Sequence, residues 1–228
     1  MPEGWYLLAE RILVVADIHG HHEALVSLLR QAGYRPGADL LVLLGDYIDR
    51  GPRGVEVVAT VRELVAAGAV ALKGNHEQML LDYLTGELEE NVYLWNGGGP
   101  TLAGYRRAGR EVLLSDVSWM EGLPLYYEHE PYVFVHAGLR PGRALADQSP
   151  DDLLWIREEF YAFPTGLADR TVIFGHTPTV FFTGSPEVWF AGDKIAVDTG
   201  AAYGFFLTLL ELPGGRTWRV PTGTAYRV

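Results

Sequence analysis

The first 85 residues alternate between short apolar runs and helical segments, and this alternation constrains the fold more than any other feature. Apolar runs occupy residues 11–16 (RILVVA), 40–44 (LLVLL) and 69–72 (AVAL). Runs of this kind are typical of strands buried on both faces. After each run, apolar residues recur at helical spacing, and Gly33 and Gly68 stand where two of the helices are expected to end. This β-α-β-α-β-α order predicts parallel strands joined by right-handed crossovers.

The rest of the chain follows a different pattern. Residues 86–122 hold Trp95, a glycine triplet and mixed charge, and we expect a small helical cap over the sheet ends. Short strands separated by turns are expected at residues 132–135, 171–174, 188–190, 195–197, 205–210 and 218–220. Residues 1–228 are therefore predicted to form a single α/β domain, a layered sandwich with a second, more antiparallel sheet.

Composition excludes several functions. The 228 residues include 18 basic and 29 acidic side chains, a net charge of −11, and an acidic surface repels nucleic acid. There is no cysteine, which excludes a thiolate nucleophile, a cysteine zinc site and disulfides. No apolar run approaches the roughly 20 residues of a membrane-spanning helix. We therefore expect a soluble, cytoplasmic protein that binds neither nucleic acid nor membranes.

Polar side chains follow five of the predicted strands at the point where each strand ends. Ligand sites in α/β sheets form outside the carboxyl ends of strands, and glycines beside these residues let the backbone turn sharply. The same edge is therefore expected to gather these side chains. They are Asp17 and His19, then Asp46, Asp49 and Arg50, then Asn75 and His76, and finally His136 and His176.

The types of side chain indicate a metal site. Asp17, His19, Asp46, Asn75, His136 and His176 offer two carboxylates, one amide oxygen and three imidazoles. That is too many ligands for one ion and suits two. Mn²⁺, Fe²⁺, Co²⁺ and Zn²⁺ accept such mixed nitrogen and oxygen sets, whereas Mg²⁺ and Ca²⁺ prefer oxygen alone.

Taken together, the motifs resemble those of the calcineurin-like metallophosphoesterases. The more specific resemblance is to the phosphoprotein phosphatase branch and its small bacterial and bacteriophage lambda-type serine/threonine phosphatases. It covers roughly residues 11–211 and implies a two-sheet α/β/β/α sandwich, a single domain with residues 86–122 as a cap insertion. The motifs that carry it are DIHG at 17–20, GDYIDRG at 45–51, GNHEQMLLD at 74–82, NGGG at 96–99, HAG at 136–138, WIRE at 155–158, FGHTP at 174–178 and DTGA at 198–201.

The resemblance also implies a role for each site residue. Asp17 and His19 bind the first metal, Asp46 bridges, and Asn75, His136 and His176 bind the second, with a bridging hydroxide that attacks phosphorus. Manganese is the expected metal, and iron, zinc, cobalt or nickel would also serve. Arg50 and Arg157 grip the phosphate oxygens, for which a guanidinium fork is well suited. His76 acts as general acid, and Asp49 holds its imidazole in the required tautomer.

Three functions remain open at this point. The first is a phosphomonoesterase acting on phosphoserine or phosphothreonine in a protein or peptide, or on a small phosphorylated molecule. The second is a hydrolase of diadenosine tetraphosphate that uses the same site, and the third is a non-catalytic metal-holding scaffold. Asp49 and Glu77 favour the first, since bacterial symmetrical hydrolases of this kind often lack the acid at the position of Asp49 and have Asp in place of Glu77. The oligomeric state is left open, and Arg106, Arg107 and Arg110 of the cap could face either the site or solvent.

Overall fold

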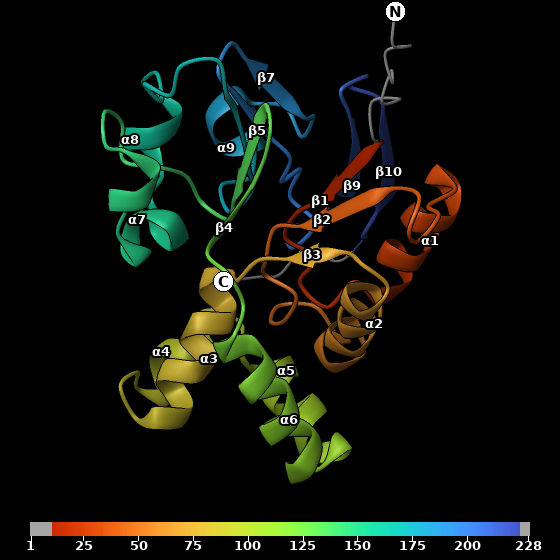
Figure 1. Ribbon diagram of the computed structural model, residues 1–228. Coiled ribbons are helices and arrows are strands. Elements are labelled where there is room, and N and C mark those ends of the chain that lie inside the picture. The colour runs from red at the N-terminus through yellow and green to blue at the C-terminus, as the bar shows by residue number, and fades with distance from the viewer. Residues whose placement is uncertain (1–10, 224–228) are drawn as a thin grey trace, which may run out of the picture.

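Two five-stranded sheets pack face to face at the centre of the computed structural model, which describes residues 11–223 (Figure 1). The first sheet has the order β10-β9-β1-β2-β3. Its β1, β2 and β3 are parallel, as predicted. The late strands β9 and β10 join this sheet antiparallel, with β9 beside β1. The strands are β1 (Ile12–Val15), β2 (Leu40–Leu43), β3 (Val70–Ala71), β9 (Phe206–Leu212) and β10 (Thr217–Pro221).

The second sheet has the order β4-β5-β6-β8-β7. Its three central strands are parallel and its two edge strands are antiparallel. The expectation of a more antiparallel second sheet is wrong, because both sheets contain two parallel and two antiparallel pairings. The prediction also lacked β4, whose YYEH sequence is short and half polar. The strands are β4 (Tyr126–His129), β5 (Tyr132–Val135), β6 (Thr171–Phe174), β7 (Trp189–Ala191) and β8 (Lys194–Ala196).

Helices cover the outer face of each sheet, which gives four layers. On the outer side of the first sheet lie α1 (His22–Ala32), α2 (Gly54–Ala66) and α3 (Asn75–Thr85). Beyond the second sheet lie α7 (Pro150–Trp155), α8 (Glu158–Tyr161), α9 (Val180–Thr183) and a 3₁₀ turn at Leu145–Asp147. No helix within residues 11–223 has both the length and the apolarity needed to cross a membrane.

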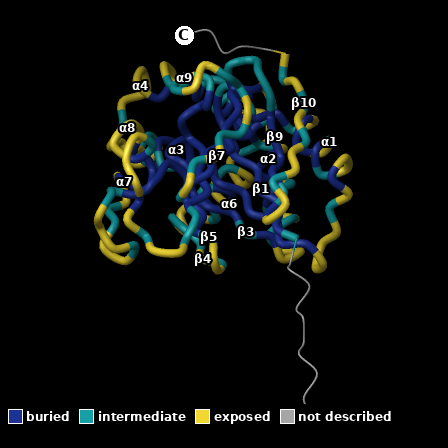
Figure 2. Tube along the Cα trace, turned by 90° about the horizontal axis from the view of Figure 1, so that it is seen from above, coloured by how far each residue is buried: buried dark blue, intermediate teal, exposed yellow. Residues whose placement is uncertain are grey.

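The alternation of side chains along the strands builds three cores between these layers. Leu13 and Val15 of β1 pack toward α1 and α2. Ile12 and Val14 point the other way and meet Phe134 of β5 between the two sheets. A third core lies between the second sheet and α7 and α8. The buried stretches therefore run through the middle of the molecule and the exposed ones around its rim (Figure 2). The α/β/β/α sandwich is confirmed.

Residues 86–122 are helical, as predicted. They form α4 (Glu90–Trp95), α5 (Gly99–Ala108) and α6 (Arg110–Glu121). Helix α5 packs against α2 and α6 against α3, so this segment extends the outer helical layer at one end of the molecule (Figure 1). Its treatment as a cap insertion, and the single domain over residues 1–228, stay predictions.

An ion pair between the half-buried Arg11 and the buried Asp39 connects the start of β1 to the start of β2. Arg11 donates to the Asp39 carboxylate from Nε at 3.0 Å and from Nη2 at 2.6 Å, and the Arg35 backbone N–H donates to it at 2.8 Å. The hydrogen bonds from Arg11, with those from Arg35, lower the pKa of Asp39 to about 2. An aspartate in an unfolded chain has a pKa of about 3.9.

We expect the ionised Asp39 to stabilise the fold above about pH 4 and this contribution to disappear as the pH falls toward 2. The folded pKa lies below the unfolded one, so the contribution at pH 7 is about 2 kcal/mol. Urea unfolding of the wild type and of Asp39→Asn should differ by about that amount at pH 7 and converge near pH 2. An equal difference at both pH values would contradict this assignment.

Candidate metal centre

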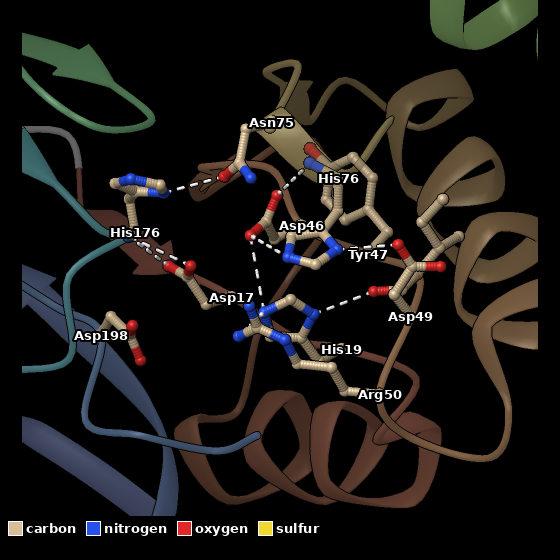
Figure 3. Close-up of polar contacts among 12 residues, drawn as sticks. Asp17, His19, Asp46, Tyr47, Asp49, Arg50, Asn75, His76, His176 and Asp198 are labelled. Carbon is tan, nitrogen blue, oxygen red and sulfur yellow. Dashed lines mark hydrogen bonds and ion pairs between the residues drawn. The ribbon is translucent and has the colours of Figure 1, made fainter. Parts of the chain in front are cut away.

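Apart from Arg157, which follows α7, the predicted site residues lie at the carboxyl ends of β1, β2, β3, β5 and β6. The structure brings them into one group, in which all but the half-buried Arg50 are buried (Figure 3). The loops that carry them are strained. Seven non-glycine residues among the described ones have a positive φ, a conformation that costs free energy and is found preferentially at functional sites. Six of the seven are predicted site residues, namely Asp17, His19, Asp46, Asp49, Arg50 and His176.

Two glycines allow these loops to approach each other closely. A Cβ atom at Gly74 would lie 2.2 Å from Asp46 Oδ1, and one at Gly175 would lie 2.1 Å from Asp17 Oδ2. Neither distance is compatible with a side chain. These positions therefore require glycine, because only an absent Cβ lets the backbone of one loop contact the carboxylate of another.

Asp46 is the central residue of the group. Its Oδ2 lies 3.4 Å from His19 Nε2, and its Oδ1 lies 3.5 Å from His136 Nε2 on the other side. Two sets of side chains around it could hold a metal ion: Asp46 with His19 and His76, and Asp46 with His136 and His176. Asp46 is the member that both sets share, as expected of a bridging carboxylate.

The second set also includes the amide oxygen of Asn75. Asn75 Oδ1 lies 2.8 Å from His136 Nε2 and 2.8 Å from His176 Nδ1. Asp17 approaches the centre from β1, and its carboxylate accepts the His176 backbone N–H at 2.9 Å. All six predicted metal ligands thus lie at the centre, although His76 rather than Asp17 completes the compact set around His19.

The hydrogen bonds of the imidazole rings leave a nitrogen of each ring available for a metal ion. His19 Nδ1 lies 2.9 Å from the Ile48 carbonyl oxygen, and His136 Nδ1 lies 2.8 Å from that of Leu44. A proton on each Nδ1 leaves the Nε2 lone pair directed at the centre, the usual arrangement of metal-binding histidines. His176 turns Nδ1 toward Asn75 Oδ1 at 2.8 Å, so Nδ1 is the nitrogen that this ring would offer to a metal ion.

The electrostatics agree with that fit. Burial lowers the pKa of His19, His136 and His176, so these rings are neutral and free to bind a cation. Burial also raises the pKa of Asp17, and the nearby carboxylates of Asp198 and Asp46 raise it further. Several buried carboxylates in one place need compensating positive charge. Neutral imidazoles beside crowded carboxylates form a donor set for divalent cations such as Mn²⁺ or Zn²⁺.

His76 and Asp49 form a buried pair beside this centre. His76 Nδ1 lies 2.7 Å from Asp49 Oδ2, and His76 Nε2 lies 3.9 Å from Asp46 Oδ2. Asp49 is held in turn by the Tyr93 hydroxyl, which donates to Oδ1 at 2.7 Å, and by Thr101 Oγ1, which accepts the Asp49 N–H at 2.8 Å. The sequence analysis missed Tyr93 and Thr101, since only the fold shows that residues 86–122 contact this loop.

Two arginines flank the centre on different loops. Arg50 Nη1 lies 3.2 Å from His19 Nε2, and its backbone N–H donates to the Gly97 carbonyl oxygen at 2.9 Å. Arg157 Nη1 donates to Thr177 Oγ1 at 3.2 Å. Arg50 is half-buried and Arg157 is exposed. Both predicted phosphate-binding residues lie beside predicted metal ligands.

Glu77 holds the loop after β2 against the start of α3. Its carboxylate is fully buried and accepts backbone N–H groups of Asp46, Tyr47 and Gly74 at 2.8–2.9 Å. These bonds tie the loop after β2 to the start of α3. Glu77 therefore positions Asp46 and Asn75 from the side away from the centre.

A fold of two mixed sheets with a shared carboxylate and histidines at the strand ends defines a metal-dependent phosphoesterase. The model of the calcineurin-like phosphoesterase family matches residues 10–210, and the chain belongs to this family. It is 33% identical over 210 residues to serine/threonine-protein phosphatase 1 of Salmonella typhimurium, covering 88% of this chain and 91% of the relative.

Other relatives are named for a different substrate. The chain is 27% identical over 244 residues to an asymmetrical bis(5'-nucleosyl)-tetraphosphatase of Anoxybacillus flavithermus, covering 93% of this chain and 95% of the relative. A solved structure provisionally named a diadenosine tetraphosphatase superposes with a TM-score of 0.72 at 24% identity, covering 94% of this chain and 95% of that one. This last likeness concerns the fold.

The chain is thus a metal-dependent phosphatase, a hydrolase of phosphoester bonds, and the predicted family and enzyme class are confirmed. The family acts with divalent metals, which the two groups around Asp46 could hold. Its substrates are phosphorylated proteins or small phosphorylated molecules. The identity of the metal, the cytoplasmic location and the individual roles of the site residues stay predictions.

Proposed function

We propose that this protein hydrolyses phosphoserine or phosphothreonine at a centre of two divalent cations, with manganese as the metal. Asp17, His19 and Asp46 hold one ion, and Asp46, Asn75, His136 and His176 hold the other. The observation that carries this proposal is that the two Asp46 oxygens face histidines on opposite sides. Two bound divalent ions supply Lewis acidity toward the phosphoryl oxygens and a strong nucleophile derived from water.

In this proposal His76 supplies the proton for the leaving oxygen. Asp49 accepts the Nδ1–H and thereby fixes the ring, so that Nε2 faces the centre. The Tyr93 hydroxyl occupies the second oxygen of Asp49 and keeps the carboxylate from turning away. A general acid must lie within reach of the proton-accepting oxygen in a fixed orientation. The hydrogen bonds from Tyr93 to Asp49 and from His76 to Asp49 support that role.

Arg50 and Arg157 hold the phosphoryl group. The two guanidinium groups lie on different loops beside His19 and beside the His176-Thr177 turn. Charge-assisted hydrogen bonds from arginine to phosphate are strong and directional. Two arginines together with the metal ions suit a single phosphoryl group.

The arginines of residues 86–122 support a monoester substrate over a tetraphosphate. Helix α5 begins beside the centre, where the Gly97 carbonyl oxygen accepts the Arg50 N–H. Arg106 and Arg107 lie in its last turn, about 10 Å farther along the helix axis at 1.5 Å per residue. Arg110 begins the following helix. These residues therefore add no charge next to the metal ligands, whereas a tetraphosphate would benefit from several cations there.

Hydrolysis of a dinucleoside tetraphosphate is the second candidate, and exposed aromatic rings near the centre favour it. Trp155 is 40% exposed and lies edge-on to His176 at 6.1 Å. Phe181 is 59% exposed and contacts Tyr203, whose ring lies 5.4 Å from the Arg50 guanidinium carbon. Rings of this kind can stack on a nucleobase.

The two candidates are separated by assaying the Mn²⁺-loaded enzyme on phosphoserine and phosphothreonine peptides and on diadenosine tetraphosphate under the same conditions. We expect kcat/KM to be higher on the peptides by about tenfold or more. The Arg106→Ala/Arg107→Ala double variant should leave both values unchanged. A tenfold preference for the dinucleotide, with a raised KM in the double variant, would establish the second candidate instead.

A further inference from the structure

Lys194 is buried in the core outside the second sheet, and none of the roles above uses it. It is the first residue of β8 and is 2% exposed. Its side chain lies on the same face of the strand as Ala196, which belongs to the core between this sheet and α7 and α8. A lysine is almost never buried to this extent unless its charge has partners. Its ammonium group must therefore be satisfied within the protein.

The ammonium group of Lys194 holds the end of a short helix. Nζ donates to the Phe160 carbonyl oxygen at 3.0 Å and to that of Phe163, at the end of α8 and just after it. Nζ also lies 4.8 Å from the centre of the Phe160 ring. A lysine at a helix C-terminus can satisfy carbonyl groups that have no partner within the helix. Lys194 therefore fastens α8 to the second sheet.

Asp193 adds a second connection at the same place. Its Oδ2 accepts the Thr165 backbone N–H, and its Oδ1 lies 3.6 Å from Lys194 Nζ. Residues 158–165 are thus joined to the start of β8 through two neighbouring side chains. Because a helix of four residues is not stable by itself, the position of α8 depends on these connections and on the packing of the Phe160 ring.

Arg157, one of the two predicted phosphate-binding arginines, directly precedes α8. Its carbonyl oxygen accepts the N–H groups of Phe160 and Tyr161 at 2.9 and 3.1 Å, so its backbone is fixed to the helix. Its exposed side chain donates from Nη1 to Thr177 Oγ1 at 3.2 Å and to the His176 carbonyl oxygen at 3.4 Å. Contacts this long hold a flexible side chain weakly. The place of the guanidinium therefore depends on where α8 holds the Arg157 backbone.

We propose that Lys194 is a positioning residue for Arg157, because it anchors α8 where the guanidinium can reach the phosphoryl group of the substrate. This inference rests on the proposed function, in which Arg157 holds that group. Lys194 itself lies in the core and acts through Phe160 and the helix. Loss of its ammonium group would leave two carbonyl oxygens without their donor, which costs free energy where they are buried, and would release the segment that carries Arg157.

The test is the affinity of the Mn²⁺-loaded enzyme for inorganic phosphate, measured by isothermal calorimetry in a double-mutant cycle of Lys194→Met and Arg157→Ala. Methionine fills the space of the lysine stem and lacks the donor. We expect Lys194→Met to weaken phosphate binding about 10-fold or more, because a displaced binding group loses much of its effect. In the Arg157→Ala background it should have no effect. Mn²⁺ affinity should stay unchanged, which excludes an effect through Phe160 on the adjacent Gly138 turn.

Arg11→Met is the matched control. Arg11 donates to the carbonyl oxygens of Ala32 and Gly33 at the end of α1, at 3.0 and 3.1 Å, and this helix does not carry Arg157. Both Lys194→Met and Arg11→Met should lower the thermal midpoint by about 4 °C or more, since each leaves carbonyl groups without their donor. Only Lys194→Met should change phosphate affinity, which separates positioning from stability.

The outcomes distinguish this inference from the proposed function. Unchanged phosphate affinity in Lys194→Met, or an equal loss with and without Arg157, would overturn the inference alone. A weakened Mn²⁺ site would overturn it as well, since Lys194 would then act through the metal ligands. Should Lys194→Met not fold, Asp193→Ala removes the second connection and must weaken phosphate binding only when Arg157 is present. If Arg157→Ala by itself leaves phosphate affinity unchanged, the proposed role of Arg157 fails and the inference fails with it.

Discussion

Asp46→Asn is expected to weaken both metal sites at once and to lower kcat by at least roughly 10³-fold, since each ion contributes several kcal/mol to the transition state. Asp46 is the member shared by the two candidate metal groups. An amide can offer only one good metal-binding oxygen and carries no charge. Mn²⁺ bound per chain, measured by mass spectrometry of the metal after gel filtration, should fall together with activity.

Asp116→Asn is a suitable control for this prediction. Asp116 is also buried and paired, with the Tyr105 hydroxyl and Arg62, but it lies between helices away from the centre. Its replacement should leave kcat and metal content unchanged. Two tightly bound ions in Asp46→Asn, or full activity of the wild type after chelation, would contradict the role of Asp46.

The second large effect is expected for His76→Asn, and it should depend on the leaving group. Loss of a general acid costs roughly 10²–10⁴-fold in rate when the leaving oxygen needs a proton. The full loss should therefore appear on a phosphoserine peptide, whose leaving group is a poor alkoxide. On p-nitrophenyl phosphate, whose leaving group departs without a proton, the loss should be much smaller.

The metal content of His76→Asn provides the control, since His76 also belongs to one candidate metal group. Unchanged Mn²⁺ affinity with a leaving-group-dependent loss supports the general acid. Equal losses on both substrates, together with a weakened metal site, would make His76 a ligand instead. Asp49→Asn and Tyr93→Phe should give progressively smaller losses of the same kind, because each acts through His76.

The parallel strands and their polar ends could be predicted because the signals are local. A buried strand appears in the sequence as a short apolar run, and parallel strands place their carboxyl ends at one edge. The residues at those ends must then meet, as Asp46 and His136 do. The pairing of β9 with β1 has no local signal, because nothing in residues 206–212 specifies a partner about 200 positions away.

The supporting residues of the site could not be predicted for the same reason. Tyr93 and Thr101 contact Asp49 only because distant segments fold against the strand ends. The short helices α7, α8 and α9, of four to six residues, were also missed. Their length gives too few turns for an apolar period to show.

Crystals of the Mn²⁺-loaded protein, measured at the manganese absorption edge, test the account most directly. Anomalous difference density should show two peaks within one site, both next to the Asp46 carboxylate. One should lie on the His19 side and the other on the side of His136 and His176. A single peak, or peaks that do not contact Asp46, would contradict the two-metal centre on which the proposed reaction depends.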